Sequence, residues 1–236
     1  MHHKLLSIAQ SIRLPSICVL CNQFHKNSLA VCHECMGLIP LLGPSCHHCA
    51  FPLFDNAFAV CGYCIKKKPY FDTSTIAYSF EEPLRSLLHR FKYHNELYLG
   101  PFLSQLILNA WRHMPTYPQC LIPVPMHRQK IKSRGFNQTA ILTRIIAKRL
   151  QIPYDLYFCK KIINTQPQAQ LDGTKRRNNL QGAFTVCTLP YTHVALIDDL
   201  LTTGNTANEL AHTLKKSGVE RVELWCCART VPKRSY

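Results

Sequence analysis

The sequence has no run of about 18 uncharged apolar residues, the length that a membrane-spanning helix needs. Its first 14 residues carry Lys4 and Arg13 around a short apolar run, without a long apolar centre or a small-residue cleavage site. This segment therefore predicts an amphipathic helix rather than a secretion signal. We expect a chain without a membrane span.

Acidic residues are also scarce, with 13 Asp and Glu against 28 Lys and Arg, for a net charge of +15. Eight cysteine thiolates and two zinc ions would lower that charge only to +11. A field of this sign favours phosphate-bearing partners such as nucleotides, nucleic acid or pyrophosphate. Plain solubility is the alternative explanation of the charge.

The 13 cysteines cannot all pair with one another, because their number is odd. Five of them follow no pattern, which would be unusual in a secreted protein. We therefore expect a reducing compartment and a cytoplasmic location. These five residues are Cys120, Cys159, Cys187, Cys226 and Cys227.

The other eight cysteines form four Cys-x2-Cys pairs, each of which can place two thiolates of one tight turn on one metal ion. Two such turns complete a tetrahedral Zn²⁺ site, so the pattern predicts one or two structural zinc ions. Disulfides or an iron–sulfur cluster are the alternatives. Sequential filling is the simplest partition, and an interleaved one stays open. The pairs are Cys18 with Cys21, Cys32 with Cys35, Cys46 with Cys49, and Cys61 with Cys64.

The composition changes near residue 68, where the cysteine pattern ends. We expect an N-terminal helix and zinc module over residues 1–68 and a second domain over residues 69–236, with Lys66–Pro69 as a linker.

The second domain alternates β-rich runs with amphipathic stretches, which predicts an α/β fold with a doubly wound parallel sheet. Val194–Ile197 is a continuous apolar run, typical of a strand buried on both faces. The other expected strands are 75–80, 120–124, 183–187 and 219–228, and the expected helices are 84–93, 100–114, one capped by Asn137, and 207–217.

The most informative segment follows the buried strand: Asp198-Asp199-Leu200-Leu201-Thr202-Thr203-Gly204-Asn205-Thr206. Gly204 permits a tight turn with inward-pointing amides, and the following helix adds the positive end of its dipole. The threonine hydroxyls can donate further hydrogen bonds. Together these groups predict a nest for a phosphate dianion.

The two aspartates repel phosphate but accept hydrogen bonds from vicinal hydroxyls, or hold water of a Mg²⁺ shell. A 5-phosphoribosyl group carries both features. The carboxyl end of a parallel strand is where open α/β sheets bind ligands. An ordinary Asp-rich connection is the alternative, and the glycine and lysine pattern of a Walker loop is absent.

This segment resembles the signature of type I phosphoribosyltransferases, and residues 17–230 resemble the ComF (GntX-like) family of competence-associated proteins. The further motifs that carry this resemblance are Val124-Pro125-Met126-His127, Arg134-Gly135-Phe136-Asn137-Gln138, Gln168 with Arg176-Arg177-Asn178-Asn179-Leu180, and Ala183-Phe184. The resemblance implies an N-terminal cysteine module followed by a phosphoribosyltransferase-like domain.

The resemblance also implies roles for individual residues. It makes Val124 and Pro125 part of a pyrophosphate loop, and Arg134 the favoured cation of the basic stretch that follows. It makes Arg176, Arg177 and Asn179 part of a lid, and Lys92 part of a Lys-aromatic pair. Asp198, Asp199 and Arg134 are the expected catalytic residues.

Two functions follow from these expectations. One is a competence protein needed for natural transformation, which binds phosphoribosyl pyrophosphate, acts on or with internalised single-stranded DNA, and contacts competence or DNA-processing proteins. The other is an active Mg²⁺-dependent phosphoribosyltransferase whose nucleobase-like acceptor the sequence does not identify.

Overall fold

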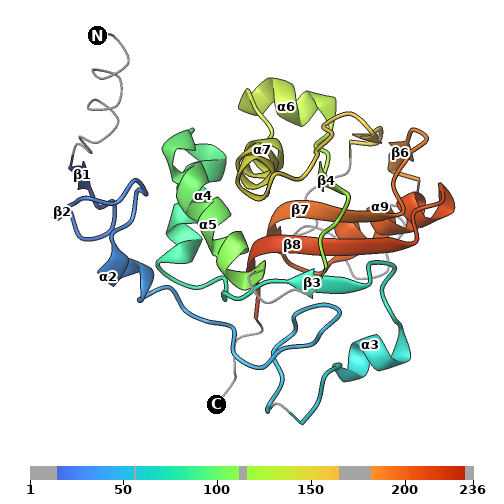
Figure 1. Cartoon of the computed structure of the whole chain (residues 1–236), viewed down its shortest axis with the longest axis horizontal. Coiled ribbons are helices and arrows are strands. Elements are labelled where there is room, and N and C mark those ends of the chain that lie inside the picture. Colours follow the sequence, from blue (N-terminus) through green and yellow to red (C-terminus); the bar gives the residue numbers. More distant parts are fainter. Residues whose placement is uncertain (1–14, 56, 112–115, 165–181, 232–236) are drawn as a thin grey trace, which may run out of the picture.

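A computed structural model describes residues 15–55, 57–111, 116–164 and 182–231. A four-stranded sheet lies at its centre, in the order β3-β8-β7-β4, and all neighbouring strands are parallel (Figure 1). The strands are β3 (Thr73–Thr75), β4 (Cys120–Pro123), β7 (His193–Leu201) and β8 (Arg221–Arg229).

Helices cover both faces of this sheet, because the side chains of each strand alternate between the faces. Ala195 and Ile197 of β7 pack with α4 (Leu84–Tyr93), α5 (Gly100–Trp111) and α7 (Gln138–Leu150). Val194 and Leu196 pack on the other face with α9 (Asn205–Lys216). The predicted doubly wound sheet is confirmed.

The remaining elements flank the sheet. The cysteine module contains an antiparallel pair of two-residue strands and two short helices, and a second antiparallel pair stands beside α9 (Figure 1). The elements are β1 (Ser16–Ile17), β2 (Phe24–His25), α2 (His33–Met36), α3 (Gly62–Lys66), η1 (Leu97–Leu99), α6 (Arg128–Arg134), β5 (Cys159–Lys161) and β6 (Phe184–Val186).

The chain that follows the module is fastened to the sheet domain. The backbone N–H of Tyr70 donates to Asn208 Oδ1 at 2.7 Å, and its ring stacks on His212 of α9. The Asp72 carboxylate accepts from Lys215 Nζ at 2.8 Å and from the N–H of Val222 at 2.9 Å. Residues 70–72 therefore join α9 and β8.

Three elements differ from expectation. Strand β7 does not end before the two acids but runs to Leu201, because its backbone pairs with β8 as far as Arg229. The basic stretch that contains Arg134, which was not among the expected helices, forms helix α6, and this helix ends at Gly135 with a φ of 86°. Strand β3 precedes the expected 75–80, where Tyr78 and Ser79 form only single bridges.

Helix α4 has the predicted limits, and Asn137 caps α7 as predicted, with its side chain accepting from the N–H of Thr139. None of the helices in the described ranges is long and apolar enough to cross a bilayer.

Candidate functional site

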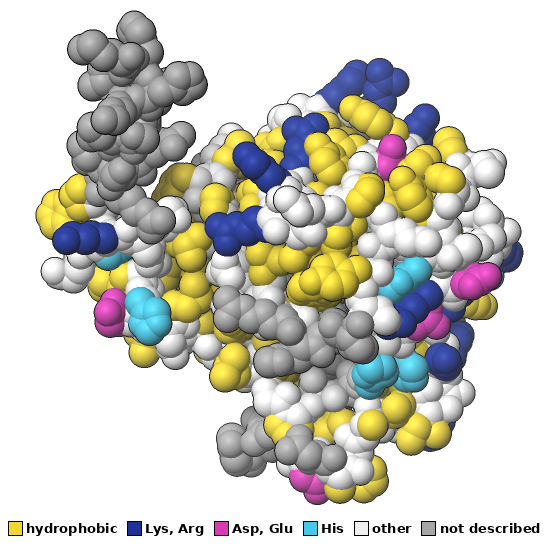
Figure 2. All heavy atoms as spheres, in the orientation of Figure 1, with side chains coloured by type: hydrophobic (Ala, Val, Ile, Leu, Met, Phe, Trp, Pro, Cys, Tyr) yellow, Lys and Arg dark blue, Asp and Glu magenta, His cyan; other side chains and the backbone are white. Residues whose placement is uncertain are grey.

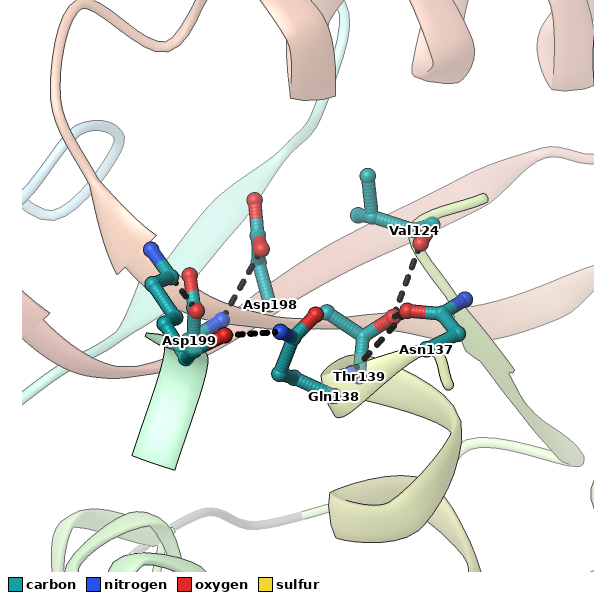
Figure 3. Close-up of polar contacts among 7 residues, drawn as sticks. Val124, Asn137, Gln138, Thr139, Asp198 and Asp199 are labelled. Atoms are coloured by element: carbon teal, nitrogen blue, oxygen red, sulfur yellow. Dashed lines mark hydrogen bonds and ion pairs between the residues drawn. The ribbon is translucent and has the colours of Figure 1, made fainter. Parts of the chain in front are cut away.

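The two neighbouring acids lie in the last part of β7 and, because successive strand residues face opposite ways, they line its two sides. Asp199 is buried and faces α4, where Lys92 Nζ lies 2.8 Å from its Oδ2 (Figure 3). Asp198 Oδ1 accepts from the N–H of Asp199 at 2.9 Å. The carboxyl edge of the sheet thus holds two acids in different surroundings.

The surroundings of the edge raise the pKa values of both Asp198 and Lys92. Burial and the adjacent Asp199 raise the pKa of Asp198 to about 7, while Lys92 partly opposes this. Burial alone would lower the pKa of Lys92, but Asp199 and then Asp198 raise it overall. Lys92 is therefore charged at neutral pH, and Asp198 is poised to gain or lose a proton there.

A buried network holds this edge together (Figure 3). Gln138 Nε2 donates to the carbonyl of Lys92 at 3.2 Å. Thr139 Oγ1 lies 2.8 Å from the carbonyl of Val124 and from Asn137 Oδ1. Gln138, at the end of the predicted motif, thus binds the end of α4, and the next residue, Thr139, binds the loop after β4.

The expected phosphate loop connects β7 to α9. Gly204 adopts a φ of 77° and occupies the position before the helix, where it brings no side chain to cap the first amides of α9. Thr202 and Thr203 are exposed, while Asn205 and Thr206 are half-buried in the first turn. This arrangement leaves backbone donors at the positive end of the helix for an anion.

Helix α6 carries the four predicted cations, Arg128, Lys130, Lys132 and Arg134. Figure 2 shows basic side chains along the edge of the molecule above this helix. The Arg134 guanidinium lies over the ring of Tyr93, 5.0 Å from its centre. Tyr93 is the residue that follows Lys92. Between β4 and α6, Val124 is buried, and Pro125, Met126 and His127 are half-buried.

Lys161 at the end of β5 is a site residue that the sequence pattern did not single out. Its ammonium lies 5.7 Å from the ring centre of Phe184. Burial, with repulsion from Lys130, lowers the pKa of Lys161 to about 8, and the attraction of Asp198 opposes this. The side chain of Lys161 reaches Phe184 because β5 pairs with β6, and a motif of neighbouring residues does not show this pairing. Arg176, Arg177 and Asn179 lie outside the described residues.

The eight patterned cysteines form two groups in sequential order: Cys18, Cys21, Cys32 and Cys35, then Cys46, Cys49, Cys61 and Cys64. Within each group the sulfur atoms lie within 4.8 Å of one another. The Cys21–Cys32 and Cys49–Cys61 sulfur pairs are 3.8 and 3.7 Å apart. Ligands at the usual Zn–S distance form a tetrahedron with edges of about 3.8 Å, so both groups fit zinc and neither is a disulfide.

The second group adjoins the phosphate loop. Cys49, Cys64, Lys67 and Lys68 line one side of a hollow whose other side includes Thr203, Gly204 and Asn205. Arg229, the last residue of β8, also lines this hollow and donates from Nε to the carbonyl of Cys49 at 3.0 Å. The loop is therefore bounded by a metal-binding segment as well as by the sheet.

Comparison with known proteins adds three findings on the sequence. Residues 9–65 match the family model described as a double zinc ribbon domain. The chain is 34% identical over 222 residues to "Competence protein F" of Haemophilus influenzae, covering 90% of this chain and 96% of that protein. It is 27% identical to "DNA utilization protein YhgH" of Escherichia coli K12, covering 93% of this chain and all of that protein.

A more distant relative is "Competence protein ComFC" of Bacillus subtilis, which is 24% identical over 86% of this chain and 90% of its own length. Among solved structures, adenine phosphoribosyltransferase from Leishmania tarentolae overlaps 67% of this chain and 77% of its own, with 16% identity and a TM-score of 0.39. The doubly wound fold is assigned from the strand order and the helices on both faces of the sheet. The zinc ribbon match and the two four-cysteine groups support structural zinc sites.

Proposed function

The chain belongs to the ComF family of competence proteins, and on that premise we propose that it is a cytoplasmic protein of natural transformation that binds phosphoribosyl pyrophosphate and acts on or with internalised single-stranded DNA. The names of its relatives, "Competence protein F" and "DNA utilization protein YhgH", support the role in DNA handling. The choice of ligand is supported by the carboxyl end of β7, where Asp198 and Asp199 precede a loop whose backbone amides lie at the N-terminus of α9.

The parts of the ligand correspond to the parts of this edge. The amides and hydroxyls from Thr202 to Thr206 would bind the 5-phosphate. The Asp198 carboxylate, once ionised, would accept from the ribose hydroxyls. Lys92 uses its ammonium on Asp199 and has further N–H bonds to offer a phosphate oxygen. Arg134 and its neighbours on α6 would add positive charge for the pyrophosphate.

Magnesium would be bound with the ligand, and Asp198 and Asp199 are the residues whose oxygens suit it. The ion would neutralise part of the pyrophosphate charge. The donor set fits, because Mg²⁺ prefers carboxylate and water oxygens and keeps several waters.

Calorimetry with phosphoribosyl pyrophosphate, with and without Mg²⁺, tests this binding. We expect binding by the wild-type chain and none by the double variant Asp198→Ala, Asp199→Ala. The matched control is Asp155→Ala, which removes a carboxylate that accepts from the N–H groups of Tyr157 and Phe158 in the turn before β5. Absence of binding by the wild type would reject the ligand.

The proposal of single-stranded DNA rests on charge and exposed aromatic rings together. Lys66, Lys67 and Lys68 are exposed, as are the neighbouring rings of Tyr63 and Tyr70. Stacking of bases on aromatic rings beside cations is a sequence-tolerant way to bind single strands. Binding of a short oligonucleotide should weaken steeply with salt, and a flat dependence of log K on log salt would contradict it.

The alternative is turnover. In that reaction an acceptor nitrogen would bond to C1 of the ribose, pyrophosphate would leave with the electron pair of the broken C–O bond, and the acceptor would lose a proton. The cations of α6 and the flanking Lys161 suit a departing pyrophosphate. Release of pyrophosphate with a panel of nucleobases would establish this activity.

A further inference from the structure

Arg229 joins the second four-cysteine group to the phosphate loop. It is the last residue of β8 and only 8% exposed. Its Nε donates to the carbonyl of Cys49 at 3.0 Å. Its Nη1 donates to the carbonyl of Leu201 at 3.1 Å and also to that of Thr202. One planar side chain thus holds a metal-ligand segment with one edge and the start of the loop with another.

The carbonyls of Leu201, at the end of β7, and of Thr202 decide where the amides after them point. Arg229 shares the Leu201 carbonyl with the N–H of Thr230, which donates to it at 3.0 Å. In a trans peptide the C=O and the following N–H point in opposite directions across one rigid plane. When Arg229 binds the carbonyls of Leu201 and Thr202, the N–H groups of Thr202 and Thr203 must therefore point away from it. Both threonines are exposed, so an anion could approach this part of the loop.

The charge of Arg229 requires an explanation of its own, because a buried guanidinium is costly without an anion nearby. None of the ion pairs found in the described residues includes Arg229. Cys49 and Cys61 of the second cysteine group act on its charge, and four thiolates around Zn²⁺ carry a net charge of −2. A filled second site therefore stabilises Arg229 where it stands.

The first cysteine group has no comparable link. Cys18, Cys32 and Cys35 belong to the apolar cluster that includes α4 and α5. Within the described residues, the hydrogen bonds to the sulfur atoms of this group come from its own segment: Cys32 N–H donates to Cys18 Sγ, and Cys35 N–H donates to Cys32 Sγ. The chain therefore offers an internal control, in which one metal site touches the loop through Arg229 and the other does not.

We propose that Arg229 is a positioning residue through which zinc at the second cysteine group orders the phosphate loop for its ligand. Zinc holds Cys49 and keeps the four cysteines as thiolates, whose net negative charge balances Arg229. Arg229 holds the carbonyls of Leu201 and Thr202, and the loop amides are thereby aimed at the phosphate. Such coupling is reciprocal, so ligand binding must also strengthen zinc retention at the second site. The ligand half of this proposal rests on the proposed function above, whereas the ordering of the loop does not.

Hydrogen exchange without ligand tests the ordering of the loop. The variants are Arg229→Lys, which keeps the charge but loses the fork, and Cys64→Ser, which removes a ligand of the second site. The controls are Arg221→Lys, at the other end of the same strand, and Cys21→Ser, in the first group. We expect faster exchange of residues 201–206 in both variants and in neither control, with zinc content unchanged in Arg229→Lys.

Calorimetry and zinc release test the ligand half. We expect Arg229→Lys to bind phosphoribosyl pyrophosphate on the order of tenfold more weakly than the wild type, from the loss of charged hydrogen bonds. Zinc transfer to a chromogenic chelator should have two phases, one for each cysteine group. We expect the ligand to slow only the phase of the second group, which is the phase that Cys64→Ser removes.

The outcomes are distinct. Unchanged loop exchange in Arg229→Lys overturns the inference, whether or not the wild type binds the ligand. Faster loop exchange with no ligand binding by the wild type rejects the proposed function and supports the ordering of the loop. Equal ligand affinity of Arg229→Lys and the wild type overturns the coupling.

Discussion

The cysteine module and the sheet domain reach order by different means. In the module, the buried positions are mostly metal ligands, and one of its clusters consists of Cys46, Cys61 and Cys64 alone. In the sheet domain, the interior is filled by Leu, Ile, Val, Phe and Trp on both faces of four strands. The cysteine module is too short to bury enough apolar surface, so metal coordination stabilises it. The larger sheet domain is stabilised by apolar packing.

The same difference shows at the surface. Phe54 is 100% exposed and Ile65 is 73% exposed, although both belong to the module. In the sheet domain, residues of the same types are buried in β7, α4 and α5. The apolar side chains of Phe54 and Ile65 therefore contribute little to the folding of the module and are available for contacts with other molecules, whereas Val31 and Ile39 are buried against the sheet domain.

Removal of zinc should have the largest effect, because a structural site supplies on the order of 10 kcal/mol. We expect a strong chelator to unfold the module while the sheet domain keeps its helical circular dichroism. Metal analysis before and after treatment measures the loss, and added zinc should restore the module. An unchanged thermal melt together with no bound metal would contradict the comparison.

Truncation in the sheet domain should come next. Leu196→Ala removes a fully buried side chain of β7 and should lower the free energy of unfolding by about 2–5 kcal/mol. Zinc content should stay that of the wild type. Urea denaturation measures the change, and Phe54→Ala in the module is the control, expected within about 0.5 kcal/mol. Similar losses for both variants would mean that apolar packing supports the module as well.

The network behind the site should have a moderate effect. Thr139→Val keeps the shape of the side chain but leaves the carbonyl of Val124 without its hydroxyl donor, which should cost about 1–3 kcal/mol. Thr213→Val in α9 removes a similar hydroxyl from a half-buried position and should cost less. Thermal unfolding compares the two, and equal shifts would show that the network has no special weight.

The pH dependence of ligand binding should be the smallest effect. The folded pKa of Asp198 is raised from 3.8 to about 7, so its carboxyl is mostly neutral at pH 6 and mostly ionised at pH 8. Because ribose hydroxyls and Mg²⁺ need the ionised form, affinity should rise about tenfold, or about 1.4 kcal/mol, between these values. Calorimetry at several pH values measures this, and Asp198→Asn should remove the dependence. A fall in affinity over this range would contradict the role of Asp198.

Patterns of short range were enough to predict much of this molecule. The four cysteine pairs predicted the metal sites, and the spacing of Leu84, Leu87, Leu88 and Phe91 predicted α4 with its limits. The apolar run at Val194 predicted a central strand. In each case the residues that matter are neighbours in the sequence, so the pattern and the structure describe the same local fact.

Features of longer range could not be predicted in that way. Strand β7 extends through two aspartates because β8 pairs with it, and propensity alone would end it earlier. Lys161 comes under the electrostatic influence of Asp198 through the placement of the β5–β6 pair, and Arg229 binds Cys49 across 180 residues of chain. The assignment of site residues stays a prediction that ligand binding must test.

The anchoring of residues 70–72 has a practical consequence for anyone who divides this protein. Tyr70 binds α9, and Asp72 binds both α9 and β8. The segment 70–72 between the cysteine module and the sheet is therefore not a flexible linker. Proteases cut best where the backbone is loose, so this passage should resist limited digestion. An expression fragment that begins after Asp72 would lack the contacts of Tyr70 and Asp72 with α9 and β8, and should be less stable than a fragment that includes them.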